Sequence, residues 1–287
     1  MCKFRFYLLM KRLFQFFLLV FSFTATAQIV IKGKVADKKT KEPIPFASIG
    51  IKGKSYGTVC DENGVFELKI AAFTDADTLK ISAIGYNGVK VAMPVAKNYS
   101  NETIYLSVTS VQLNEVKIKP QKTITKVLGN KNYNTGICLS FTGAEGNYKG
   151  AEISIKAKNK KGRLVFLENF NFYIVKNLYK DSLTFRLNFY KEDKEGLPGE
   201  NILRKPIVFK TAVKEGVVSV NLKHLLINTD DDFFMSLECL EDQIDKEKLC
   251  FSGSVSGPCF MKVATFMDWM KIPFGGIDFN VTVTYQK

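Results

Sequence analysis

The sequence predicts an all-β protein with two β-sandwiches in tandem behind an N-terminal export signal. Short runs of alternating or β-branched residues recur about every ten residues from residue 28 onward. Turn residues separate these runs, and none of them suggests a helix. The 287 residues are 46% hydrophobic and 24% charged, a composition typical of a folded chain of one large or two medium domains.

Residues 1–27 have the organisation of a secretory signal. Four basic residues precede an apolar run over residues 13–23, and the small-residue pattern Ala25-Thr26-Ala27 follows it. That run is too short to span a bilayer, and no later run reaches the roughly 18 to 20 apolar residues that a spanning helix needs. We expect cleavage after Ala27 and export to the periplasm, the outer membrane or the cell surface. Translation could begin at Met1 or at Met10, because a complete signal also reads from Met10.

The charge balance gives little support to a nucleic-acid partner. The signal holds four of the 41 basic residues and no acidic residue, so 37 basic and 28 acidic residues remain, a formal net charge of +9. The excess is spread over both halves of the chain, which is typical of a solvated lysine-rich surface and not of a basic patch for nucleic acid. A weak attraction for acidic glycans or lipid headgroups stays open.

Residues 28–120 predict the first sandwich, with antiparallel strands. The segments 61–64 and 85–88 have the composition of tight turns. Phe66 and Leu68 should face the core, and Asp61 should cap its turn. Gly57 and Gly64 are interpreted as residues that the backbone conformation requires.

Several motifs of this domain resemble a known family. They are Gly33, Val35 and Asp37, residues 43–53, Gly57 and Thr58, Asp61, residues 64–68 and residues 81–86. Over residues 31–108 they resemble the carboxypeptidase regulatory-like domain. The resemblance implies a transthyretin-like, seven-stranded β-sandwich without catalytic residues of its own. Such modules are common in exported proteins of Bacteroidetes-type bacteria, including TonB-dependent receptors.

The segment 113–120, LNEVKIKP, resembles the link between this domain and the plug of those receptors. Only 167 residues follow it, too few for a plug and a receptor barrel. The chain is therefore not expected to be a receptor.

Residues 121–287 predict a second, jelly-roll-like sandwich of eight to ten strands, after a polar connection over residues 121–136. The strand-like runs are 137–141, 151–158, 163–175, 183–190, 206–210, 217–222, 233–240, 248–253, 259–266 and 279–285. Residues 191–201 are expected to form a long exposed loop. This half resembles the C-terminal β-sandwich, of unassigned role, of small envelope proteins, and the resemblance implies no activity.

Cysteine and histidine usage argues against a metal centre or a cofactor. The chain has one histidine, His224, and no C-x-x-C spacing. The pairing of the cysteines after residue 27 stays open, although Cys250 and Cys259 could close a short loop. These cysteines are Cys60, Cys138, Cys239, Cys250 and Cys259.

Two features are candidate binding sites. Trp269 lies in a poorly periodic, glycine-flanked segment, where an exposed aromatic ring could stack on a sugar or a partner surface. Asp230, Asp231 and Asp232 could offer oxygens to a cation, but they lack the alternate spacing of a calcium loop and suit a solvated turn better.

No catalytic set is recognisable. Residues 253–257, GSVSG, have Val255 where a nucleophile elbow needs serine. Glu238 with Glu241, or Glu145 with Glu152, could flank a glycosidic bond, but their separations cannot be read from the sequence.

The sequence therefore favours an exported, non-enzymatic envelope protein that acts as an interaction, scaffold or accessory module for a protein or glycan. The alternatives are a glycan or peptide hydrolase with carboxylates in the second domain, and an accessory component of TonB-dependent uptake. Neither the oligomeric state nor the ligand is predicted.

Overall fold

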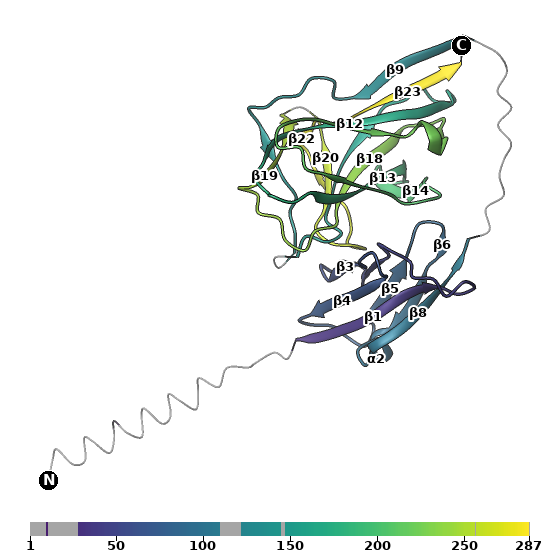
Figure 1. The fold of residues 1–287 in the computed structure, drawn as a ribbon, viewed down its shortest axis with the longest axis vertical. Helices are drawn as coiled ribbons and strands as arrows, with labels where there is room; N and C mark the ends of the chain where they lie inside the picture. The colour runs from purple at the N-terminus through teal and green to yellow at the C-terminus, as the bar shows by residue number, and fades with distance from the viewer. Residues whose placement is uncertain (1–9, 11–27, 110–121, 145–146, 256, 287) are drawn as a thin grey trace.

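The computed structural model describes residue 10 and residues 28–109, 122–144, 147–255 and 257–286. The protein is nearly all β, with 53% strand and 3% helix, as the sequence predicts. Figure 1 shows two packed β-bodies, one formed by the strands up to β8 and the other by the strands from β9 onward. The predicted signal, apart from Met10, and the predicted link over 113–120 lie outside the described residues. No helix in the described part is long and apolar enough to cross a bilayer.

The first domain is a sandwich of two four-stranded sheets. One has the order β4-β1-β8-β6 and consists of β1 (Ile29–Asp37), β4 (Val65–Ile70), β6 (Tyr86–Asn87) and β8 (Ser100–Val108). The other has the order β3-β2-β5-β7 and consists of β2 (Ser48–Ile51), β3 (Gly57–Val59), β5 (Thr78–Ser82) and β7 (Val89–Ala92).

The core of this domain follows the predicted alternation. In β4, Phe66 and Leu68 are buried and Glu67 between them is exposed. Asp61 caps the following turn, because its Oδ1 accepts the backbone N–H groups of Asn63 at 2.9 Å and Val65 at 2.8 Å. These local predictions are confirmed.

Three features differ from the expected seven-stranded, antiparallel, helix-free sandwich. The two described sheets together have eight strands. β1 pairs with β8 in parallel, and one helical turn, α2 (Met93–Ala96), precedes β8. Alternation of side chains is the same in parallel and antiparallel strands, so the sequence pattern carries no information about direction. Pro94 is the second residue of the helical turn, where its missing N–H removes no intrahelical hydrogen bond.

The second domain is also a sandwich. Its eight-stranded sheet contains β9 (Thr123–Gly129), β10 (Cys138–Leu139), β12 (Val165–Asn177), β16 (Gly216–Asn221), β17 (Asn228–Thr229), β19 (Leu249–Ser254), β22 (Gly276–Ile277) and β23 (Asn280–Gln286). Its seven-stranded sheet contains β11 (Glu152–Ala157), β13 (Leu183–Glu192), β14 (Pro198–Asn201), β15 (Ile207–Thr211), β18 (Phe233–Cys239), β20 (Cys259–Lys262) and β21 (Met270–Ile272). One 3-10 turn, η1 (Lys223–Leu225), follows β16.

Phenylalanine side chains fill the space between these two sheets. Phe170 and Phe172 of β12 and Phe189 of β13 are fully buried, and the Phe170 and Phe189 rings meet across the sheets with their centroids 6.4 Å apart. Phe172 packs against Phe279 at 6.2 Å. Phenylalanine rings thus make up much of the core of this domain.

Two segments expected to be loops are strands. β9 lies in the predicted polar connection and pairs with β23 along its whole length, but only Leu128 of β9 is buried, so the strand lacks a hydrophobic signature. The predicted long loop over 191–201 is a hairpin of β13 and β14. Asp193 closes its turn by accepting the N–H groups of Glu195 and Leu197.

The disulfide joins Cys138 of β10 to Cys250 of β19, with their Cα atoms 5.3 Å apart. The suggested Cys250–Cys259 bridge is therefore wrong. Cys259 is free and buried, as are Cys60 and Cys239. The two bonded residues are 112 positions apart, so no local spacing could indicate their pairing.

The two domains dock closely around Thr265 of the second domain. Its hydroxyl donates a hydrogen bond to the Ile49 carbonyl at 2.7 Å. A Cβ on Gly57 would stand 2.8 Å from the Thr265 nitrogen, and one on Gly50 would stand 2.9 Å from its Oγ1. Gly57 lies in a regular strand without a positive φ, so its interpretation as a conformational glycine is wrong. A glycine is needed at position 57 because Thr265 of the second domain leaves no room for a side chain there.

We predict that Gly57→Ala weakens domain docking. The added methyl group has no room against Thr265, and such overpacking costs about 1–3 kcal/mol. Denaturant unfolding of residues 28–287 should show that loss, and the double variant with Thr265→Ala should recover part of it, since one of the clashing atoms is then gone. An unchanged unfolding free energy for Gly57→Ala would contradict the docking.

Candidate functional site

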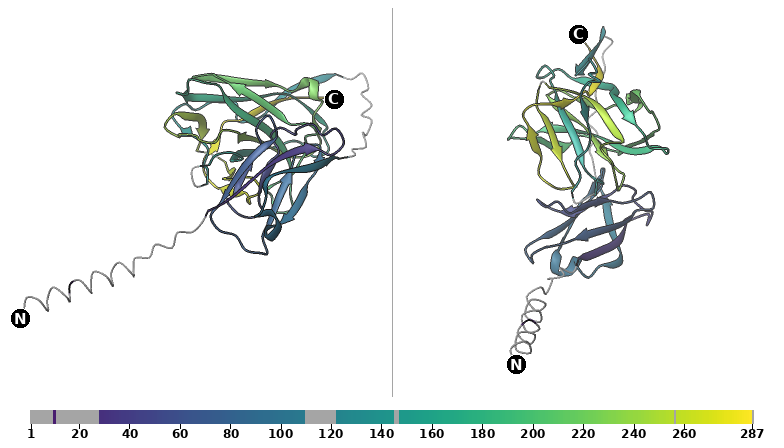
Figure 2. Two further views of the ribbon diagram at one scale, coloured as in Figure 1. Left: turned by 60° about the horizontal axis from the view of Figure 1, so that its bottom comes forward. Right: turned by 90° about the vertical axis from the view of Figure 1, so that its left-hand side faces the viewer.

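A groove of about 590 Å³ lies at the junction of the two domains. Lys80 and Tyr86 contribute to its wall from the first domain, and Asn188, Lys262 and Trp269 contribute from the second. The views in Figure 2 show the first domain against one end of the second. Another hollow of about 520 Å³ also has residues of both domains in its wall, but none of its charged residues is buried. The 590 Å³ groove is therefore the stronger candidate.

The second domain supplies a row of charged residues beneath this groove. Across β13, β18, β11 and β20, Arg186 is in register with Glu238, Glu238 with Glu152, and Glu152 with Lys262. We call these four residues the charge ladder. They lie on the sheet face opposite the phenylalanine core, because side chains alternate along each strand.

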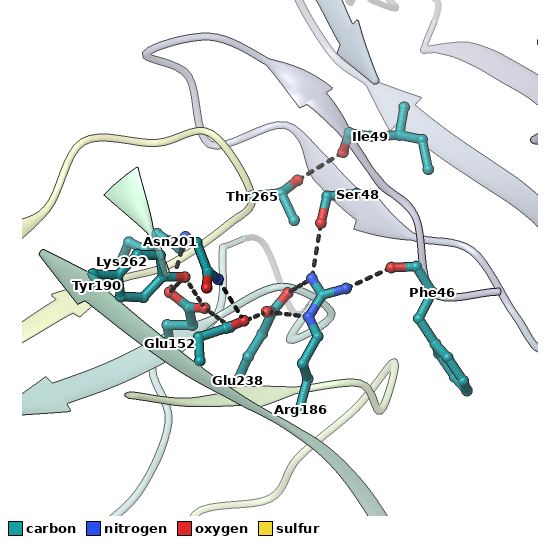
Figure 3. Close-up of polar contacts among 11 residues, drawn as sticks. Phe46, Ser48, Ile49, Glu152, Arg186, Tyr190, Asn201, Glu238, Lys262 and Thr265 are labelled. Carbon is teal, nitrogen blue, oxygen red and sulfur yellow. Dashed lines mark hydrogen bonds and ion pairs between the residues drawn. The ribbon is translucent and has the colours of Figure 1, made fainter. Parts of the chain in front are cut away.

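Arg186 connects the ladder to the first domain (Figure 3). Its Nε donates to Glu238 at 2.7 Å, and its Nη2 contacts the other oxygen of that carboxylate. Nη2 also donates to the Ser48 hydroxyl at 2.8 Å, and Nη1 donates to the Phe46 carbonyl. One guanidinium thus pairs with a carboxylate and holds two groups of the neighbouring domain.

Neutral donors complete the network around the two carboxylates. The Asn188 amide donates to Glu238 at 2.8 Å and also to Glu152. The Tyr190 hydroxyl donates to Glu152 at 2.8 Å, and the Lys262 ammonium pairs with Glu152 at 2.9 Å. Two cations and two acids therefore balance in charge, and every carboxylate oxygen has a donor.

Burial and neighbouring charges separate the pKa values of the two acids. Burial raises the pKa of Glu152 to about 7, against the opposing effect of Lys262. Burial also acts to raise the pKa of Glu238, but the Arg186 guanidinium outweighs it and holds that pKa below its usual range. Burial, with the nearby Glu152 and Glu238, raises the pKa of Tyr190 well above its usual range, so its hydroxyl stays a donor.

Trp269, the predicted binding residue, lies in the wall of this groove. Its ring packs edge-on against Tyr190, with 5.7 Å between centroids, and the Lys262 ammonium lies 4.8 Å from its centroid. The indole is partly buried. Its binding role stays a prediction.

The three predicted aspartates lie elsewhere, between β17 and β18. Asp232 pairs with Lys156 at 3.0 Å and accepts the Asn159 N–H, whereas Asp230 and Asp231 are exposed. They line a separate hollow of about 490 Å³. Among the described residues, no group of three or more histidine, cysteine or acidic side chains is arranged to hold a metal ion.

Of the two carboxylate pairs suggested from the sequence, Glu238 with Glu241 is not supported, and Glu145 with Glu152 stays a prediction. Glu152 faces Glu238, whereas Glu241 accepts the Thr184 N–H and Glu145 lies outside the described residues. The sequence signal that could have indicated the charge ladder was the presence of a charged residue within an otherwise hydrophobic strand, as in LTFRLNFY and FFMSLECL. The role of Arg186 and the pairing of Glu238 with Glu152 were not predicted, because strand register joins segments that are far apart in the sequence.

The first domain, which Arg186 contacts through Phe46 and Ser48, matches a known family. Residues 31–118 match the family model of the CarboxypepD_reg-like domain. The first domain is a carboxypeptidase regulatory-like domain. This family is non-catalytic, and here the regulatory-like domain contributes backbone carbonyls, Ser48 and one wall of the groove. No curated protein matches the chain.

We predict that Glu152 makes stability fall as pH rises. Its folded pKa of about 7 exceeds the ordinary value of 4.5, so between these values the folded state binds more protons than the unfolded state. The unfolding free energy should drop from pH 4.5 to 7, by at most about 3 kcal/mol. Glu152→Gln should abolish this slope in urea titrations.

Glu238→Gln provides the contrast. It leaves Arg186 buried without its carboxylate, which should destabilise the protein by about 3–5 kcal/mol at neutral pH. Equal pH slopes for the wild type and Glu152→Gln would rule out the assigned role of Glu152.

Proposed function

We propose that the protein is an exported, non-enzymatic envelope protein that acts as an interaction or accessory module and binds its ligand, a glycan or a protein, in the groove between its domains. The observation that carries this proposal is the composition of the groove. Its walls come from both domains, and the buried charge ladder holds them in place. A preformed concave site with a few polar groups and aromatic rings is the usual form of a ligand site.

Two features support the location. Residues 1–27 have the composition of an export signal. The disulfide between Cys138 and Cys250 suits an oxidising compartment.

Binding fits this site better than catalysis. The side chains of Glu152 and Glu238 are 0% and 3% exposed, and each is held by protein donors. A general acid or base must reach the atom that it protonates or deprotonates. Lys80, Arg204 and the Trp269 ring line the groove, and Glu238, which also contributes to its wall, is paired with Arg186.

We predict that Trp269→Ala weakens ligand binding and that Phe274→Ala does not. Both rings are partly or largely exposed, but only Trp269 lies in the groove wall. The assay is retention of residues 28–287 on a polysaccharide panel, together with cross-linking in the native host. Trp269→Ala should lower retention, or capture of the main partner, about tenfold. Equal effects of the two variants would contradict ligand binding in the groove.

A hydrolase is the second candidate, because Glu152 and Glu238 face each other and Glu152 has a pKa suited to a proton donor. We expect purified 28–287 to release neither sugars from glycans nor C-terminal residues from peptides. Release of sugars that Glu152→Gln abolishes while its unfolding curve shows a folded protein would establish a glycan hydrolase. Release of C-terminal residues that a chelator abolishes would establish a carboxypeptidase.

A further inference from the structure

Two cations in the groove wall lie outside the charge ladder. Lys80 of β5 is half-buried, and its ammonium lies 4.6 Å from the centroid of the Phe266 ring. Arg204 follows β14 and is exposed. Among the described residues, neither of them forms an ion pair. The groove therefore contains positive charge that the protein does not neutralise.

Lys80 also has like charges around it. It is in register with Lys90 on β7, and like charges directly opposite each other across two strands are destabilising. Burial lowers the pKa of Lys80, and Lys90, Lys52 and Lys262 lower it further. An anion in the groove would relieve this repulsion.

The acids near the groove do not cancel this charge. Glu238 is paired with Arg186, and Glu152 is paired with Lys262. Glu200 at the rim is 78% exposed and lies 3.5 Å from Lys191. A cleft with an excess of one sign of charge concentrates ligands of the opposite sign.

Ring faces and neutral polar groups accompany the two cations. Trp269 and Phe266 line the same groove, as do Ser82 and Asn201. Aromatic faces suit the flat, weakly polar face of a ring, while hydroxyl and amide groups suit hydroxyl-bearing ligands. A ligand that fits all of these groups has a sugar-like ring next to a negative charge.

We propose that the groove binds an acidic oligosaccharide, with the anionic group at Lys80 and Arg204 and a sugar ring against Trp269. This inference rests on the proposed function and names the ligand class of the same site. Carboxylated and sulfated sugars share the required chemistry. An acidic peptide and an anionic membrane surface are the competing classes.

The test uses residues 28–287 and defined probes in isothermal titration. Oligogalacturonate supplies carboxylates, its methyl ester is the neutral match, and a sulfated chondroitin oligosaccharide supplies the other anion. Poly-glutamate and vesicles with phosphatidylglycerol represent the two competing classes. We expect binding of one of the acidic sugars, at least about tenfold stronger than that of the methyl ester, and weaker at high salt.

Variants locate the site. Lys80→Met and Arg204→Met should each weaken binding about tenfold, whereas Lys126→Met on the exposed edge strand β9 should leave the Kd unchanged. Lys80→Met should fold, because it removes a cation from a crowd of like charges. Its thermal unfolding curve checks this.

The outcomes separate this inference from the proposed function. Suppose that a neutral glycan binds and that Trp269→Ala weakens this binding but Lys80→Met does not. That result would support ligand binding in the groove and would contradict an acidic oligosaccharide as the ligand. Equal binding of poly-glutamate or vesicles would also overturn it, as would no binding of either acidic sugar. The proposed function itself would be contradicted if Trp269→Ala left the binding of every captured ligand unchanged.

Discussion

The buried ion pair between Arg186 and Glu238 is the interaction on which the arrangement of this protein depends. Both side chains are almost fully buried, so each charge needs its partner and further hydrogen bonds to offset the loss of water. Two further N–H groups of Arg186 donate to the Phe46 carbonyl and the Ser48 hydroxyl of the regulatory-like domain. The same guanidinium therefore stabilises a sheet of one domain and the position of the other.

This constraint explains why strands of the second domain are buried on both faces. One face of β13 and β18 packs on the phenylalanine core, and the other carries the ladder and lies toward the first domain. Thr265 of the second domain adds a close contact, because Gly50 and Gly57 of the first domain have no side chain that would clash with it. The groove lies at this junction, and Lys80 of the first domain and Trp269 of the second domain both line it.

The accuracy of the sequence predictions follows the range of the interactions involved. The Asp61 turn was predicted because its hydrogen bonds span two and four residues. The long strands were predicted because alternation is visible within one segment, whereas β9 was missed because it is an exposed edge with one buried residue. Trp269 was noticed for its irregular segment, but the sequence held no sign that it would lie next to Tyr190 and Lys262.

The sequence by itself determined the all-β class, most strands, the turn at Asp61 and the family of the first domain. Local periodicity, turn chemistry and short motifs specify each of these without reference to distant residues. Only the tertiary structure decided that Glu152 faces Glu238, that Cys138 bonds Cys250, and that Arg186 reaches Ser48, 138 positions away. Register between strands and docking between domains decide these contacts, and no local pattern records either.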